Sequence, residues 1–93
     1  MARVKLIEET PNVLIIRMRH VPIIDATGIR TLDEVFKESK HRGTKLILSE
    51  VHSQQVMKEL QDARLLFSIG KANVTNSFQG ALSRSMILLQ EMQ

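Results

Sequence analysis

Residues 21–28, here called the motif loop, constrain the fold most, because an apolar, β-branched run ends there in Asp25-Ala26-Thr27-Gly28 and a helical pattern begins at once. Asp25 and Thr27 carry short oxygen-bearing side chains, which cap a helix by accepting from its free N–H groups. Gly28 permits a tight turn that leaves those N–H groups exposed. The sequence therefore predicts a helix N-terminus suited either to capping alone or to an anion or regulatory phosphate.

The segments on either side of the motif loop alternate between strand and helix patterns. Residues 13–18 are β-branched and nearly continuously apolar, which predicts a buried strand. A helix follows the motif, and bases and a glycine at 40–43 are typical of its end. The run 45–48 predicts the next strand, so the order indicates a right-handed βαβ unit with parallel strands. The apolar side of the helix consists of Ile29, Leu32, Val35 and Phe36.

Two further apolar runs are interpreted as strands. Residues 4–7 precede a turn at 8–12 that contains Pro and Asn, which predicts an antiparallel hairpin with the strand at 13–18. Residues 65–67 are short and apolar and stop before Gly70, so they are assigned to a fourth strand. The predicted sheet is therefore mixed, with about four strands.

Two more helices complete the prediction. Ser53 is placed to cap a second helix with Val56, Met57 and Leu60 on its inner side. Residues 73–76 form a polar connection, and a last helix begins near Ser77. Its apolar stripe is predicted to contain Phe78, Ala81, Leu82, Ser85, Leu88, Leu89 and Met92. Residues 1–93 are thus expected to form a single α/β domain with a mixed sheet of about four strands, an N-terminal antiparallel hairpin, parallel βα units and about three helices.

The residue types present exclude several kinds of chemistry. The chain has no Cys, so it has no disulfide, thiolate metal site or Cys nucleophile. Its four glycines match neither a P-loop nor a dinucleotide fingerprint. The three histidines, at positions 20, 41 and 52, lack metal-ligand spacing, and no G-x-S-x-G nucleophile motif occurs. We therefore expect no enzyme activity and no metal.

Charge and hydropathy narrow the kinds of partner. The formal net charge of +3 is spread through the chain, and there is no Trp or Tyr, so a nucleic-acid surface is not expected. The longest apolar runs, 13–16 and 86–89, are far shorter than the ~20 residues of a membrane helix. The sequence predicts a soluble domain, and its abrupt start before a strand is typical of a fragment excised from a longer protein.

The motif loop is also the best candidate for a regulated surface. A phosphate on Thr27 would add nearly two negative charges at a helix N-terminus, where the helix dipole favours them, although Asp25 would oppose them. The neighbouring apolar residues cannot all face the core, and some should form an exposed patch suited to a partner. These residues are Val21, Pro22, Ile23, Ile24 and Ala26.

The order of a hairpin, a strand, Asp-x-[Ser/Thr]-Gly at a helix start, βα units and a long last helix resembles the STAS domain, over roughly residues 4–89. This family includes bacterial anti-sigma factor antagonists and the cytoplasmic domains of SulP anion transporters. In the antagonists the motif usually reads Asp-Ser-Ser-Gly, and a partner kinase phosphorylates the second Ser. Thr27 occupies that position here, and Ala26 replaces the first Ser. The stretches 21–29 and 43–49 are more similar to the transporter branch.

The resemblance implies a non-catalytic regulatory domain, the C-terminal STAS domain of a SulP-type sulfate or anion transporter. Expected partners are the transmembrane anion-transport domain of the same chain, a cytosolic protein and a second copy in a homodimer. The expected location is the cytoplasmic side of the inner or plasma membrane. The family is compatible with weak nucleotide binding, but the sequence indicates no cofactor.

The resemblance also assigns the site residues. Thr27 is the expected phospho-acceptor, and the expected partner surface consists of Ile24, Asp25, Ala26, Thr27, Gly28 and Arg30. Two alternatives stay open. One is a free-standing anti-sigma factor antagonist that acts as a phosphorylation-controlled partner switch. The other is a small nucleotide hydrolase, against which the missing P-loop and metal cluster count heavily.

Overall fold

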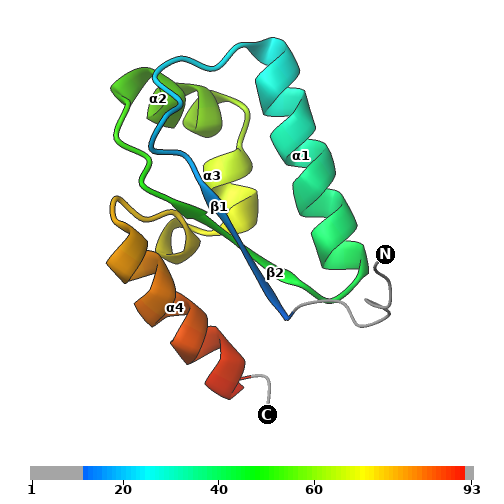
Figure 1. Cartoon of the computed structure of the whole chain (residues 1–93). Coiled ribbons are helices and arrows are strands. Elements are labelled where there is room, and N and C mark those ends of the chain that lie inside the picture. Colours follow the sequence, from blue (N-terminus) through cyan, green and yellow to red (C-terminus); the bar gives the residue numbers. More distant parts are fainter. Residues whose placement is uncertain (1–11, 92–93) are drawn as a thin grey trace, which may run out of the picture.

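The structure of the chain, a computed structural model, describes residues 12–91 (Figure 1). The elements follow one another in the order β1 (Val13–Arg17), α1 (Ala26–His41), β2 (Lys45–Ser49), α2 (Gln54–Asp62), α3 (Leu65–Ile69), the 3₁₀ helix η1 (Lys71–Asn73) and α4 (Phe78–Glu91). The α/β class is therefore confirmed. The predicted run at 4–7, and with it the antiparallel hairpin, lies outside the described residues.

The two strands pair in parallel, as predicted for the βαβ unit. Val13 lies opposite Lys45 at one end of the ladder and Arg17 opposite Ser49 at the other. Within residues 12–91 the sheet has these two strands instead of about four. A third stretch continues the ladder briefly, since Leu48 forms a parallel bridge with Val74. The predicted polar connection at 73–76 therefore also pairs its backbone with the end of β2.

The interpretation of residues 65–67 as a strand is wrong, because they form the short helix α3. Leu65 and Ile69, four residues apart, are buried on one side of this helix, and Phe67 between them is 85% exposed. Arg64 adopts a left-handed conformation with φ of 63°, so the chain turns out of α2 directly into α3. A three-residue apolar run is too short for its periodicity to distinguish a helix from a strand. The helix is favoured here because it brings both Leu65 and Ile69 into the core.

The boundaries of α1 agree with the predicted ones. Asp25 is the N-cap residue, and Lys40 and His41 lie in the last turn. Gly43 follows with φ of +76°, a conformation that glycine adopts without steric cost. The helix buries Leu32 and Ser39 against the sheet. Local capping signals of this kind are readable from sequence because they depend on neighbouring residues alone.

The core lies in two clusters on opposite faces of the sheet. On one face, Leu46 and Leu48 of β2 pack with residues of α1, α2 and α3. On the other face, Ile47 packs with Ala81 and Leu88 of α4 (Figure 1). Side chains of a strand alternate between faces, which explains why neighbouring β2 residues enter different clusters.

Within residues 12–91, the apolar stripe predicted for the last helix is only partly buried. Met92, the last residue of the predicted stripe, lies outside the described residues. Ala81 and Leu88 are in the core, but Leu82 is 42% exposed and Leu89 is 38% exposed. Met86 and Ile87 are exposed as well. The helix is apolar on several sides, so periodicity alone could not show which residues face the sheet.

Candidate functional site

The motif loop leaves the carboxyl end of β1 and leads into the first turn of α1 (Figure 1). Asp25 supplies the predicted cap, since its Oδ1 accepts a hydrogen bond from the Gly28 N–H at 2.9 Å. The other predicted capping residue, Thr27, lies in the first turn with its side chain exposed, and its carbonyl accepts from the Thr31 hydroxyl at 3.0 Å. Capping therefore occupies Asp25 and leaves Thr27 at the surface.

Gly28 serves a different purpose from the predicted tight turn. It lies inside α1, and a Cβ placed on it would be 2.7 Å from Cγ1 of Ile24. Contacts that short do not occur between real carbon atoms, so a larger residue would displace Ile24. The glycine thus allows the loop to lie close against the start of the helix.

The apolar residues of the motif loop divide between core and surface. Ile24 is 8% exposed and belongs to the large core cluster, against which Val21 also packs. Ile23, in contrast, is 72% exposed. Pro22 and Ala26 are exposed beside it. The expected exposed apolar residues are therefore present, and Ile23 is the largest of them. Ile24, which was predicted as part of the partner surface, is buried beneath it instead.

Two side chains of α2 and its cap hold the backbone of the motif loop. The Ile24 N–H donates to Oε1 of Gln55 at 2.9 Å, and Nε2 of Gln55 donates to the Ile24 carbonyl at 2.9 Å. The Ser53 hydroxyl donates to the Pro22 carbonyl at 2.7 Å. The sequence predicts Ser53 only as a helix cap and carries no local signal for Gln55, because these residues lie 31 positions from their partners in the chain.

An ion pair lies near the motif loop, where both strands end. Nε and Nη2 of Arg17 donate to the two carboxylate oxygens of Glu50 at 2.8 and 2.9 Å, and the Ser49 hydroxyl donates to Oε2 at 2.8 Å. The hydrogen bond from Arg17 is the main cause that lowers the pKa of Glu50 to about 2. The guanidinium also lies 4.2 Å from the ring centroid of Phe78.

No sequence motif marks Glu50, which directly follows β2. Its φ is 63°, an uncommon conformation for a residue other than glycine. Both of its carboxylate oxygens already accept hydrogen bonds from Arg17. The cluster is therefore suited to joining the ends of the strands to α4 and is not an open acid or base.

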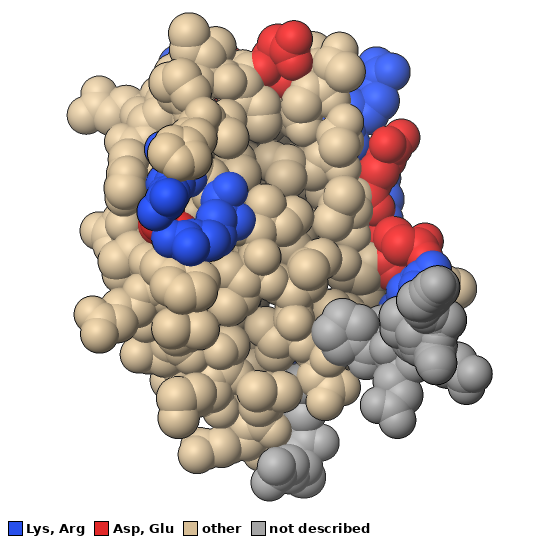
Figure 2. Space-filling model, viewed as in Figure 1, with Lys and Arg blue, Asp and Glu red and all other residues tan. Residues whose placement is uncertain are grey.

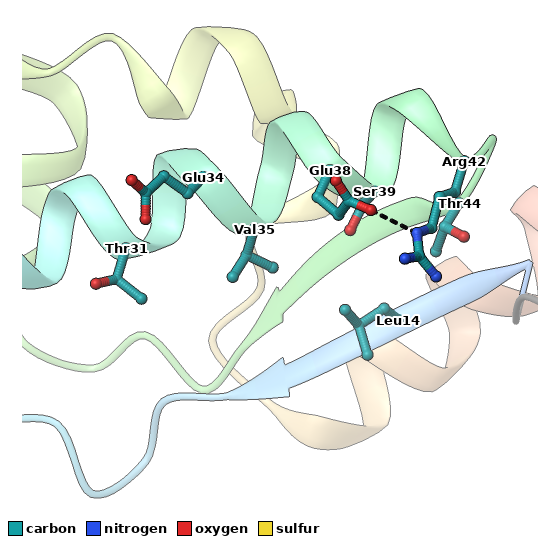
Figure 3. Close-up of a pocket in the computed structure, with 8 residues that line it drawn as sticks. All are labelled: Leu14, Thr31, Glu34, Val35, Glu38, Ser39, Arg42 and Thr44. Carbon is teal, nitrogen blue, oxygen red and sulfur yellow. Dashed lines mark hydrogen bonds and ion pairs between the residues drawn. The ribbon is translucent and has the colours of Figure 1, made fainter. Parts of the chain in front are cut away.

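A shallow groove of about 370 Å³ lies elsewhere, between α1 and the start of β1 (Figure 3). Leu14 and Val35 contribute apolar surface, and Arg42 reaches across one rim to Glu38 at 2.6 Å. Thr31, Glu34, Ser39 and Thr44 complete its lining. The motif loop does not line this groove, so the groove is separate from the predicted site.

The surface shows two further features. On the face in Figure 2, charged side chains gather in a few places, and the surface over α4 is uncharged.

Among residues 12–91, no group of three or more His, Cys, Asp or Glu side chains could hold a metal ion. No helix within these residues is long and apolar enough to cross a membrane.

Comparisons with known proteins agree on one family. The family model described as the STAS domain matches residues 2–81. A solved structure of a sulfate transporter family protein from Wolinella succinogenes is 38% identical, with a TM-score of 0.84 over 92% of this chain and 70% of that chain. The SulP transporter STAS domain from Vibrio cholerae is 36% identical, with a TM-score of 0.82 over 94% of this chain and 67% of that chain. The curated proteins contain no match. The resemblance inferred from the sequence is confirmed.

Proposed function

The chain belongs to the STAS domain family, and we propose that it is the regulatory module of a SulP-type sulfate or anion transporter. In this role it lies on the cytoplasmic side of the membrane and couples the transport domain to cytosolic partners or to assembly with a second copy. STAS domains of transporters are typically non-catalytic. The likeness to the Vibrio cholerae SulP domain, at 36% identity over nearly the whole chain, carries the proposal.

The partner surface in this proposal is the exposed side of the motif loop and the first turns of α1. Asp25, Ala26, Thr27 and Arg30 are all exposed there. Ile24 and Gly28 support the surface from beneath through their close contact. A surface whose backbone is already ordered loses little conformational entropy when a partner binds, which favours this end of the molecule as a docking site.

The test changes the surface without unfolding the domain. Thr27→Glu in the full-length transporter should reduce sulfate uptake, since it places a carboxylate on the partner surface. A negative charge in the first turn of a helix is favourable, so the isolated chain should stay folded. Asp25→Ala should also reduce uptake, while costing the isolated chain about 1 kcal/mol because the cap is lost.

Ser83→Glu is the matched control, because Ser83 is exposed on α4 and gains the same charge. Its sulfate uptake should equal that of the wild type. Unchanged uptake in both motif-loop variants would refute the proposed surface.

A second candidate function is the partner switch of the anti-sigma factor antagonists. The exposed position of Thr27 at a helix N-terminus favours it, because a kinase can reach such a side chain. A cognate kinase should then add about 80 Da to the chain at Thr27. Immunoblots of fractionated native cells distinguish the two functions: a transporter tail gives a large band in the membrane fraction, and a free switch a small soluble one.

A further inference from the structure

The paired hydrogen bonds between Gln55 and Ile24, together with the bond from Ser53 to Pro22, form what we call the amide clamp. The primary amide of Gln55 offers one donor and one acceptor to the C=O and N–H of a single residue, each at 2.9 Å. This arrangement reproduces one rung of a β-ladder with a side chain in place of a strand. Both backbone groups of Ile24 are thereby paired, although Ile24 itself is buried.

The amide clamp ties the motif loop to a firmly held element. Ser53 donates to Pro22 and at the same time caps α2, since its Oγ accepts from the Val56 N–H at 3.2 Å. Val56 and Leu60 of α2 are almost completely buried in the large core cluster. Movement of the loop away from α2 would therefore break the hydrogen bonds that Ser53 and Gln55 form with Pro22 and Ile24.

The amide clamp also determines which way Ile23 points. Its neighbours Pro22 and Ile24 are both held by their backbone groups, and Ile24 faces the core. Ile23 is left facing outward with 72% of its surface exposed. An apolar side chain on a backbone that is fixed on both sides enters a partner's pocket with little loss of conformational entropy.

We propose that Ile23 is the apolar anchor of the partner surface and that Gln55 is the residue that positions it. The expected occupant is a protein surface with an apolar pocket and an acidic rim. Arg19 and His20 line a cavity with Pro22, the residue before Ile23, and Arg30 is exposed one turn into α1. Two arginines therefore flank this surface, against the exposed carboxylate of Asp25. The inference rests on the proposed function, which it deepens by naming the anchor and its support.

The first experiment tests the amide clamp without reference to function. Gln55→Met in the 93-residue chain keeps an unbranched side chain with good helix propensity but removes both hydrogen bonds to Ile24. Amide hydrogen exchange of the Ile24 N–H, followed by NMR, should become about tenfold faster, as expected for one lost net hydrogen bond. Gln54→Met is the matched control, because Gln54 is exposed and adjacent, and it should leave this rate unchanged. Equal Ile24 exchange rates in the Gln55→Met variant and the wild type would overturn the positioning role.

The second experiment tests the anchor in the full-length transporter. Ile23→Ser and Gln55→Met should each reduce sulfate uptake severalfold, whereas Gln54→Met should not. A photo-crosslinking residue at position 23 should form adducts with a protein segment that is apolar and flanked by carboxylates. Adducts with lipid alone would overturn the protein partner.

The outcomes separate this inference from the proposed function. If Thr27→Glu reduces uptake while Ile23→Ser and Gln55→Met do not, the anchor is wrong and the proposed function stands. If none of the three variants affects uptake, the anchor and the proposed partner surface both fail. In either case, the exchange rate of the Ile24 N–H tests separately whether Gln55 holds the backbone of Ile24.

Discussion

The two faces of the sheet are packed very differently. On the face of α1, α2 and α3, the described residues form a large cluster that extends from Met18 to Ile69. On the face of α4, the described core consists of Ile47, Ala81 and Leu88, with Val13 and Ile15 only partly buried beside it. The motif loop belongs to the well-packed face through Ile24, so the candidate site stands on the face with the larger buried core.

The largest loss of stability is expected when a buried leucine is replaced by alanine, and the loss should differ between the two faces. Leu60→Ala on the well-packed face should lower the free energy of unfolding by about 3 to 4 kcal/mol, because Leu60 is completely enclosed and its neighbours cannot fill the space. Leu88→Ala on the α4 face should cost about 2 kcal/mol, since fewer buried groups surround it. Urea unfolding followed by circular dichroism measures both values. A larger loss for Leu88→Ala would contradict the comparison.

An intermediate loss of stability is expected when the ion pair of Arg17 and Glu50, at the ends of β1 and β2, is removed. The pKa of Glu50 falls from 4.5 to about 2 on folding, chiefly because Arg17 donates to its carboxylate. A lowered pKa stabilises the fold above pH 4.5, and this contribution is lost as the pH falls from 4.5 towards 2. The midpoint temperature of thermal unfolding should be lower for Glu50→Gln than for the wild type at pH 7. Between pH 4.5 and 2 this midpoint should fall less steeply in the variant than in the wild type.

Glu38→Gln is the matched control for this pH dependence. Glu38 also accepts from an arginine, Arg42, but both side chains are 59% exposed. Exposed pairs contribute little to stability, so the acid profile of this variant should follow that of the wild type. If Glu50→Gln and the wild type have parallel profiles, the partly buried pair of Arg17 and Glu50 is not the acid-sensitive contact.

The smallest effect is expected on the outer side of α4. Met86 is 63% exposed, so Met86→Gln should change the free energy of unfolding by less than about 0.5 kcal/mol. The same urea titration measures it. A loss as large as that of Leu88→Ala would mean that Met86 packs against part of the chain, and the α4 face would then be better covered than the described residues indicate.

Local signals explain which parts of the fold and site were predictable. The start of α1 at Asp25 and its end before Gly43 depend on capping residues within one turn, so they could be predicted. The parallel pairing of β1 and β2 follows from the strand, helix and strand order. In contrast, α3 was mistaken for a strand because a run as short as 65–67 has no distinguishing period.

In the candidate site, too, features that depend on adjacent residues were predictable and features that depend on distant contacts were not. The sequence by itself determined the motif loop and the cap at Asp25, because these depend on the backbone preferences of adjacent residues. It predicted Thr27 as a second capping residue, whereas the structure leaves the Thr27 side chain exposed. Only the tertiary structure decided that Ile24 turns inward and Ile23 outward, and that Gln55 holds the loop. Those choices depend on contacts between segments 31 residues apart, which local periodicity and capping rules do not encode.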